Sequence, residues 1–155
     1  MTPEEVISSY LVEHNFRVVF WPALGDQKGP KEKDWPRQPK ALADYRPGDR
    51  VGIVTGVEVS PGKFLVDVDI DWAPGYQIAA AFLPRTDFIY GRASKRVSHC
   101  LYTLQEALAC TQYKDPVDGQ MLLEVRGAKD DGTPGFQSMA PPSVWSKDDK
   151  REPLE

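Results

Sequence analysis

Alternation of apolar and polar residues is the clearest pattern in this chain, and it is strongest over residues 64–71. From residue 66 onward, every second residue is Val or Ile, and Asp67, Asp69 and Asp71 occupy the positions between and after them. Successive side chains of a β-strand point to opposite faces. The pattern therefore predicts a strand with one apolar face and one acidic face.

A second strand of the same kind is predicted over residues 121–126, where Glu124 and Arg126 lie on the face opposite three apolar residues. We expect it to pair with a strand over residues 136–140 around a turn at 127–135. The other predicted strands cover residues 17–21, 51–55, 87–90 and 97–103.

Helical periodicity appears first at the N-terminus, where Thr2 and Glu5 form a capping-box pattern with Pro3 at the first helical position. This helix is expected to reach about residue 13. The other predicted elements are helices over residues 73–83 and 106–113, a long basic loop at 22–40, a turn at 57–62 and a basic loop at 91–96.

The composition indicates one water-soluble domain: 155 residues, 41% hydrophobic and 27% charged. No apolar stretch approaches the roughly 20 residues needed to cross a bilayer, and the N-terminus does not resemble a signal peptide. We expect a cytoplasmic protein with no membrane partner. With only two cysteines and two histidines, a structural zinc site or a disulfide framework is not expected.

The formal net charge of -4 would by itself argue against a nucleic-acid partner. Charge is unevenly distributed, however: residues 85–96 carry four basic residues and one acidic residue, and residues 64–71 carry three acidic residues and no basic one. The sequence thus separates an acidic strip from a basic strip.

Three aspartates on one strand face repel one another unless a cation neutralises them. Hard carboxylate oxygens favour Mg²⁺ or Mn²⁺, and a pair of such ions supports phosphoryl and nucleotidyl transfer. Glu124 could add a further carboxylate. Ordinary surface aspartates and a salt-bridged glutamate are the alternatives. An EF-hand is excluded, because the loop glycine it requires is replaced by Trp72.

His99 follows the basic loop at 91–96, which offers backbone amides, a hydroxyl and three cations. These are the groups that bind the polyphosphate of a nucleotide. A buried histidine with a structural role is the alternative for His99.

Several of these segments together resemble a known family. The motifs are GIVTG (52–56), LVDVDID (65–71), GRASKRVSHCLY (91–102), LLEVRG (122–127) and QSMAPPSVW (137–145). In order and spacing they resemble the bifunctional primase-polymerase domain of the archaeo-eukaryotic primase superfamily, over about three fifths of the chain.

The resemblance implies an α+β fold. Its main part is an RRM-like, mostly antiparallel sheet with flanking helices (residues 51–145), accompanied by a small N-terminal α/β unit (residues 1–50). Residues 146–155 are expected to be a frayed or truncated end. Relatives often continue into a helicase, so a helicase domain or subunit is an expected partner.

The resemblance also implies a site for template-dependent nucleotidyl transfer. Its catalytic residues would be Asp69, Asp71 and Glu124, and these together with Asp67 would hold two Mg²⁺ or Mn²⁺ ions. A PPS segment, 141–143, would close the site. The expected nucleotide-binding residues are Arg92, Ser94, Lys95, Arg96, Ser98, His99 and Arg126.

The expected ligands are nucleoside triphosphates and single-stranded or primed DNA, with the template along the basic loop at 22–40. Two alternatives stay open. One is a degenerate or truncated module that only binds nucleotides or single strands, and the other is a metal-dependent nuclease.

Overall fold

Antiparallel strands make up most of the protein, together with two short helices. The computed structural model describes residues 1–25 and 27–155. Within these residues, no helix combines the length and the apolar character needed to cross a membrane.

The helical segments are α1 (Pro3–Ser8), the π-helical segment η1 (Ser9–Glu13), the 3₁₀ turns η2 (Trp35–Arg37) and η3 (Leu42–Asp44), and α2 (Ala73–Phe82). The strands are β1 (Val18–Trp21), β2 (Arg50–Thr55), β3 (Glu58–Ser60), β4 (Lys63–Ile70), β5 (Ile89–Arg92), β6 (Lys95–Leu104), β7 (Thr111–Lys114), β8 (Met121–Arg126), β9 (Phe136–Ala140), β10 (Val144–Lys147) and β11 (Lys150–Pro153).

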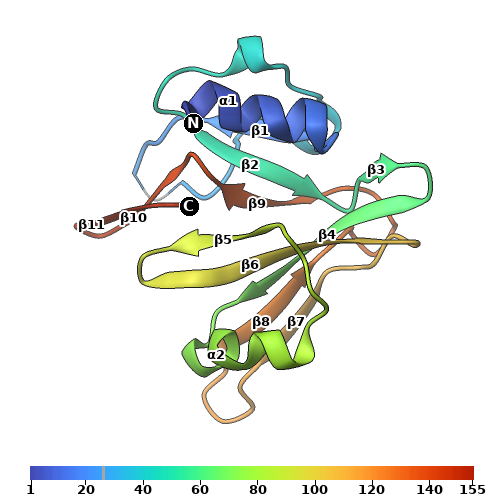
Figure 1. Ribbon diagram of the computed structural model, residues 1–155, viewed down its shortest axis with the longest axis vertical. Helices are drawn as coiled ribbons and strands as arrows, with labels where there is room; N and C mark the ends of the chain where they lie inside the picture. The colour runs from blue at the N-terminus through green and yellow to red at the C-terminus, as the bar shows by residue number, and fades with distance from the viewer. Residues whose placement is uncertain (26) are drawn as a thin grey trace.

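Two sheets form the body of the molecule (Figure 1). The smaller has the order β1-β2-β9, and α1 lies on its outer side. The larger has the order β5-β6-β4-β8-β7, with β3 paired to β4 as well, and α2 lies on its far side. Central strand β4 runs antiparallel to both of its neighbours, β6 and β8.

The predicted alternation in β4 is confirmed, and both of its faces are covered. Val68 and Ile70 pack with Ala79 of α2 and with Cys100. The opposite face carries Asp67 and Asp69 toward the smaller sheet, where both are buried. The acidic face is thus as buried as the apolar one over most of the strand.

The main core lies between α1, the smaller sheet and one end of the larger sheet. It contains Ile7 of α1, Trp21 of β1 and Ile53 of β2 together with Leu65 of β4 and Leu101 of β6. The N-terminal segment therefore shares one core with the rest of the chain, and the expected boundary at residue 50 falls at the start of β2.

The predicted capping box is confirmed: Glu5 N–H donates to Thr2 Oγ1 (3.2 Å), and Thr2 N–H donates to Glu5 Oε2 (2.7 Å). The helix predicted over residues 106–113 is wrong, because Thr111–Lys114 forms edge strand β7 on β8. The predicted pairing of residues 121–126 with 136–140 is also wrong. β8 pairs with β4 and β7, whereas β9 pairs with β2 of the other sheet.

The expectation of a frayed end over residues 146–155 is wrong as well. β10 and β11 form an antiparallel hairpin. Leu154 is buried, and backbone hydrogen bonds join Glu155 to Gly91 in both directions, at 3.0 and 2.9 Å. The basic segment at 91–96, expected as a loop, is largely the end of the β5-β6 hairpin against which this C-terminal hairpin packs.

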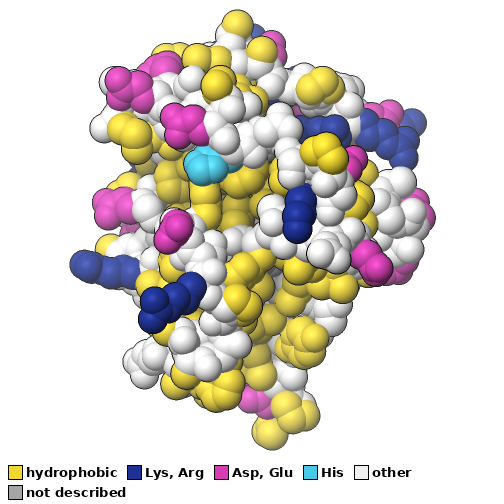
Figure 2. Space-filling view, turned by 45° about the vertical axis from the view of Figure 1, so that its right-hand side comes forward, with side chains coloured by type: hydrophobic (Ala, Val, Ile, Leu, Met, Phe, Trp, Pro, Cys, Tyr) yellow, Lys and Arg dark blue, Asp and Glu magenta, His cyan; other side chains and the backbone are white. Residues whose placement is uncertain are grey.

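Helix α2 leaves part of its apolar surface uncovered. Ile78 and Phe82 are exposed, and Trp72 just before the helix is 46% exposed. The lower part of Figure 2, where α2 lies, shows mainly hydrophobic side chains with few charges.

Ser143 ties the C-terminal hairpin to the smaller sheet. Its buried hydroxyl accepts from Val51 N–H (2.7 Å) and donates to the Val51 carbonyl (3.1 Å), and its carbonyl accepts from Leu154 N–H (2.9 Å).

The Ser143→Ala variant should lower the free energy of unfolding by about 1–3 kcal/mol, because two buried backbone groups lose their partner. Urea denaturation measures this. Exposed Ser60→Ala is the control and should change stability by less than about 0.5 kcal/mol.

Candidate functional site

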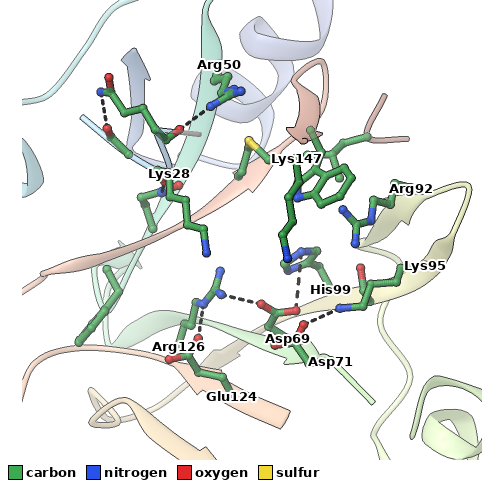
Figure 3. A pocket seen from close by; sticks show the side chains of 18 of the residues that line it. Lys28, Arg50, Asp69, Asp71, Arg92, Lys95, His99, Glu124, Arg126 and Lys147 are labelled. Atoms are coloured by element: carbon green, nitrogen blue, oxygen red, sulfur yellow. Dashed lines mark hydrogen bonds and ion pairs between the residues drawn. The ribbon is translucent and has the colours of Figure 1, made fainter. Parts of the chain in front are cut away.

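A cavity of about 880 Å³ lies between the two sheets and beside the C-terminal hairpin (Figure 3). Its acidic lining residues are Asp69, Asp71 and Glu124, all near the ends of strands of the larger sheet. Its basic lining residues are Lys28, Arg50, Arg92, Lys95, Arg126 and Lys147. The excess of basic over acidic side chains favours an anionic ligand.

Asp69 occupies the centre of the acidic side. On β4 it is paired directly with His99 of β6 on one side and with Glu124 of β8 on the other. Directly opposite residues share a sheet face, so the three side chains lie side by side. The expected convergence of Asp69 and Glu124 from neighbouring strands is therefore observed.

Arg126 connects these two carboxylates. Its Nη2 lies 2.6 Å from Asp69 Oδ2, and its Nε lies 2.7 Å from Glu124 Oε2. Gln112 Nε2 also donates to Glu124, at 2.8 Å. The acidic pair is thus neutralised by a side chain of the protein itself.

Asp71 lies just after β4 and is more exposed. Its Oδ1 lies 2.5 Å from Lys95 Nζ, which comes from the β6 end of the β5-β6 hairpin. Figure 3 shows Asp71 beside Asp69, with Lys95 reaching it from the edge of the cavity. The predicted metal ligand therefore has a lysine as its partner.

Asp67 differs from the other two aspartates because it lies beneath the cavity. It is completely buried, accepts hydrogen bonds from His99 Nδ1 (2.8 Å) and from Ser138 of β9, and does not line the cavity. The expected role of Asp67 as a metal ligand is not supported by this position. Instead it orients His99, whose Nε2 lies 3.8 Å from Asp69 Oδ1.

The His99 ring is fixed in a second way. The Tyr90 ring of β5 stacks on it, with centroids 4.7 Å apart and planes 14° apart. Because ionised Asp67 can only accept, His99 Nδ1 carries a hydrogen and Nε2 is left to face Asp69 and the cavity. Neither the fixed histidine tautomer nor Tyr90 was predicted from the sequence.

Burial and nearby charge shift the protonation of these groups. Burial raises the pKa of Asp69, and the charges of His99 and Arg126 only partly oppose it. Burial also acts to raise the pKa of Glu124, but hydrogen bonds from Gln112 and Arg126 outweigh it and the pKa is lowered. Burial would lower the pKa of Arg126, yet the adjacent carboxylates raise it, so this guanidinium stays charged.

The expected triphosphate-binding set is brought together only in part. Arg92, Lys95, Ser98, His99 and Arg126 line the cavity. Ser94 and Arg96 do not. The backbone N–H and hydroxyl of Ser94 are bonded to the Glu152 carboxylate at 2.7 and 2.8 Å, and Arg96 is exposed outside the cavity. The expectation that these two residues line the site is therefore corrected. The β5-β6 hairpin directs Ser94 toward β11 and Arg96 toward solvent.

Sequence reasoning missed the contribution of the C-terminal hairpin. Trp145 and Lys147 of β10 line the cavity, and the Arg92 guanidinium lies 3.5 Å from the centre of the Trp145 ring. Arg50 also lines the cavity, with Nη2 donating to Ser146 Oγ (2.5 Å) and to the Gly25 carbonyl (3.0 Å). Residues 144–147 (VWSK) are two apolar residues followed by two polar ones, a segment without alternation and too short to predict a strand.

The carboxylates fit a hard divalent cation in their chemistry, because Asp69, Asp71 and Glu124 supply oxygen ligands to one cavity. As the side chains stand, no three Asp, Glu, His or Cys residues in the described part of the chain are placed to enclose a metal ion. A metal at this site would therefore replace Arg126 and Lys95 as the neutralising charge.

Comparison with protein-family models, curated proteins and solved structures finds no match to this chain. The resemblance of its motifs to the primase-polymerase domain thus stays a prediction.

The ion pair with Asp67 makes stability depend on pH. Burial lowers the pKa of His99, but the charge and hydrogen bond of Asp67 and the charge of Asp69 outweigh it, so the pKa lies above 6.5. The stabilisation is fully present below pH 6.5 and is lost as pH rises through the higher folded pKa. An NMR titration in EDTA should show the raised pKa, and urea denaturation should show lower stability at about pH 8 than at about pH 6.

In Asp67→Asn, the titration of His99 should move to lower pH, because the main charge that opposes burial is gone. The exposed Asp87→Asn variant is the control and should leave it unchanged. A His99 titration that is the same in both variants would contradict the assigned ion pair.

Proposed function

We propose that the protein is a metal-dependent nucleotidyltransferase of the primase-polymerase type, which extends a nucleic-acid strand on a template. One observation carries the proposal: Asp69 is aligned between His99 and Glu124 on three adjacent strands, at the edge of a cavity rich in basic residues. Paired carboxylates beside a phosphate-binding group are what nucleotidyl transfer requires.

The strand order supports the proposal. If β4, β5, β6 and β8 are taken as first to fourth, the order β5-β6-β4-β8 is that of an RRM-like sheet. Helix α2 joins the first and second strands, as in that motif, and the site residues lie on the face away from α2. The connection before β8 contains β7, where the motif would have its second helix.

In the proposed reaction, the 3′-hydroxyl oxygen of the primer attacks the α-phosphorus of a nucleoside triphosphate. A new P–O bond forms, the bond to pyrophosphate breaks, and the hydroxyl proton passes to solvent. A bound divalent cation would lower the pKa of that hydroxyl and stabilise charge on the α-phosphate.

The protein's own residues would hold and orient the reactants. Asp69, Asp71 and Glu124 would supply carboxylate oxygens to the cation. In its doubly protonated form, which the raised pKa of His99 favours, the ring would donate from Nε2 to a phosphate oxygen while Nδ1 donates to Asp67. The template would lie along residues 22–40, whose Lys28 and Trp35 reach the cavity.

Primer extension tests the proposal. With Mn²⁺, a primed template and nucleoside triphosphates, the wild-type protein should lengthen the primer. The Asp69→Ala/Asp71→Ala variant should reduce extension at least about 100-fold, because both carboxylates that would hold the metal are lost.

The exposed aspartates Asp87 and Asp130 lie outside this cavity, so their double alanine variant is a matched control and should extend normally. Circular dichroism checks that both variants are folded. Extension by the Asp69/Asp71 variant at the wild-type rate would refute the proposal, and shortening of the primer would indicate a nuclease instead.

A second candidate function is nucleotide or single-strand binding without catalysis. The Arg126 bridge between Asp69 and Glu124 favours it, because an internal guanidinium can neutralise both carboxylates without a metal. Metal binding separates the two candidates, since only the transferase requires Arg126 to release the carboxylates.

The Arg126→Met variant tests whether these carboxylates can take a metal. Without metal, we expect it to be destabilised by about 3–5 kcal/mol, because two poorly solvated carboxylates lose their partner. Mn²⁺ at about 100 times its Kd should restore about 2.7 kcal/mol and raise Tm more than in the wild type. The exposed Arg96→Met variant is the control. If Mn²⁺ raises Tm equally in both variants, the binding-only candidate is favoured.

A further inference from the structure

The C-terminal hairpin supplies one side of the cavity. Trp145, Ser146 and Lys147 of β10 line it, together with Leu154 after β11. Figure 3 shows Lys28 and Lys147 pointing into the cavity from the side opposite Asp69 and Glu124. The cavity therefore has an acidic side on the larger sheet and a separate basic side.

The two sides differ in how their charges are compensated. Arg126 and Lys95 are already paired with the carboxylates of the acidic side. By contrast, Arg92 and Lys147 form no ion pair within 4.0 Å with any residue that the structure describes. These two positive charges are therefore available to a ligand.

Arg92 is held in place before any ligand arrives. Its guanidinium stacks on the Trp145 ring at 3.5 Å. A stacked guanidinium keeps its edge free to donate hydrogen bonds, so it can bind an anion without a large loss of side-chain entropy. Arg92 of β5 and Lys147 of β10 line the same cavity (Figure 3).

The hairpin itself is fixed to the body at several points. Ser94 is bonded to Glu152 of β11 through both its N–H and its hydroxyl. Arg50 Nη2 donates to Ser146 Oγ, and the side chain of Arg50 is 4% exposed. Arg50 Nε is buried without a partner in the described structure, next to the same cavity. This side of the cavity is thus preformed and keeps an unused donor.

We propose that Arg92 and Lys147, supported by Trp145, bind the polyphosphate of a nucleoside triphosphate on the hairpin side of the cavity. The inference rests on the proposed function for the identity of the ligand, and it moves the phosphate contacts from Ser94 and Arg96 to the C-terminal hairpin. A polyphosphate fits because it brings several negative charges into one cavity of about 880 Å³ that is lined by basic side chains.

Isothermal titration calorimetry with sodium tripolyphosphate in EDTA tests this without metal, template or catalysis. The wild-type protein should bind, and Arg92→Gln and Lys147→Gln should each weaken binding about tenfold, because each removes a charge-assisted hydrogen bond. Lys63→Gln is the matched control: it removes the same charge from the exposed start of β4, outside the cavity, and should leave Kd unchanged.

Equal affinity of the wild type and all three variants, or no binding by the wild type, would overturn the inference. A competition experiment gives a further outcome that would overturn it. If an oligothymidylate without terminal phosphates displaces tripolyphosphate, and Lys147→Gln weakens binding of both ligands equally, the site holds the backbone of a nucleic-acid strand instead. Tripolyphosphate binding that depends on Arg92 and Lys147, combined with no primer extension, would refute the proposed transferase and leave this site standing.

Discussion

The burial of Asp67 and Asp69 between two sheets is the constraint on which the rest of the site depends. An ionised carboxylate removed from water needs hydrogen bonds and opposite charge close by. Oδ2 of Asp67 finds them in His99 and Ser138, whereas Oδ1 is buried without a partner in the described structure, and Asp69 finds them in Arg126. Each of the strands β6, β8 and the opposing β9 thereby directs one side chain toward β4: His99, Arg126 and Ser138.

This compensation also organises the chemistry. The hydrogen bond from Nδ1 to Asp67 leaves Nε2 of His99 directed toward the cavity, and Arg126 brings Asp69 and Glu124 to one point. Interactions that stabilise the fold are thus the same ones that orient the groups of the proposed site. Lys147 of the C-terminal hairpin forms no ion pair with these carboxylates in the described structure, so its charge is not neutralised by them.

Much of the larger sheet could be predicted from the sequence. The period-two pattern of β4 and β8 identified both strands and the faces on which Asp69 and Glu124 lie, because alternation is a local property. Capping at Thr2 was equally local. The observed side-by-side placement of His99, Asp69 and Glu124 agrees with the motif-based prediction, whereas the activity implied by those motifs stays a proposal.

What the sequence did not predict depends on long-range contacts. Strand β9 pairs with β2 rather than with β8, and no local pattern distinguishes the two partners. β7 was taken for a helix because its short edge segment is mostly polar and exposed. The hairpin of β10 and β11 was missed because its order comes from contacts with Gly91, Ser94 and Val51, which lie far from it in the sequence. The burial of Asp67 could not be predicted, because it arises only when Ser138 of β9 packs over it.

The hydrogen bond from Ser138 to Asp67 has a mechanical consequence. It crosses from one sheet to the other, so separating the two layers at this point breaks a hydrogen bond to a buried charge, at a cost of about 1.5–3 kcal/mol. Widening of the cavity is therefore disfavoured: at that cost, an opened form would make up no more than about a tenth of the molecules.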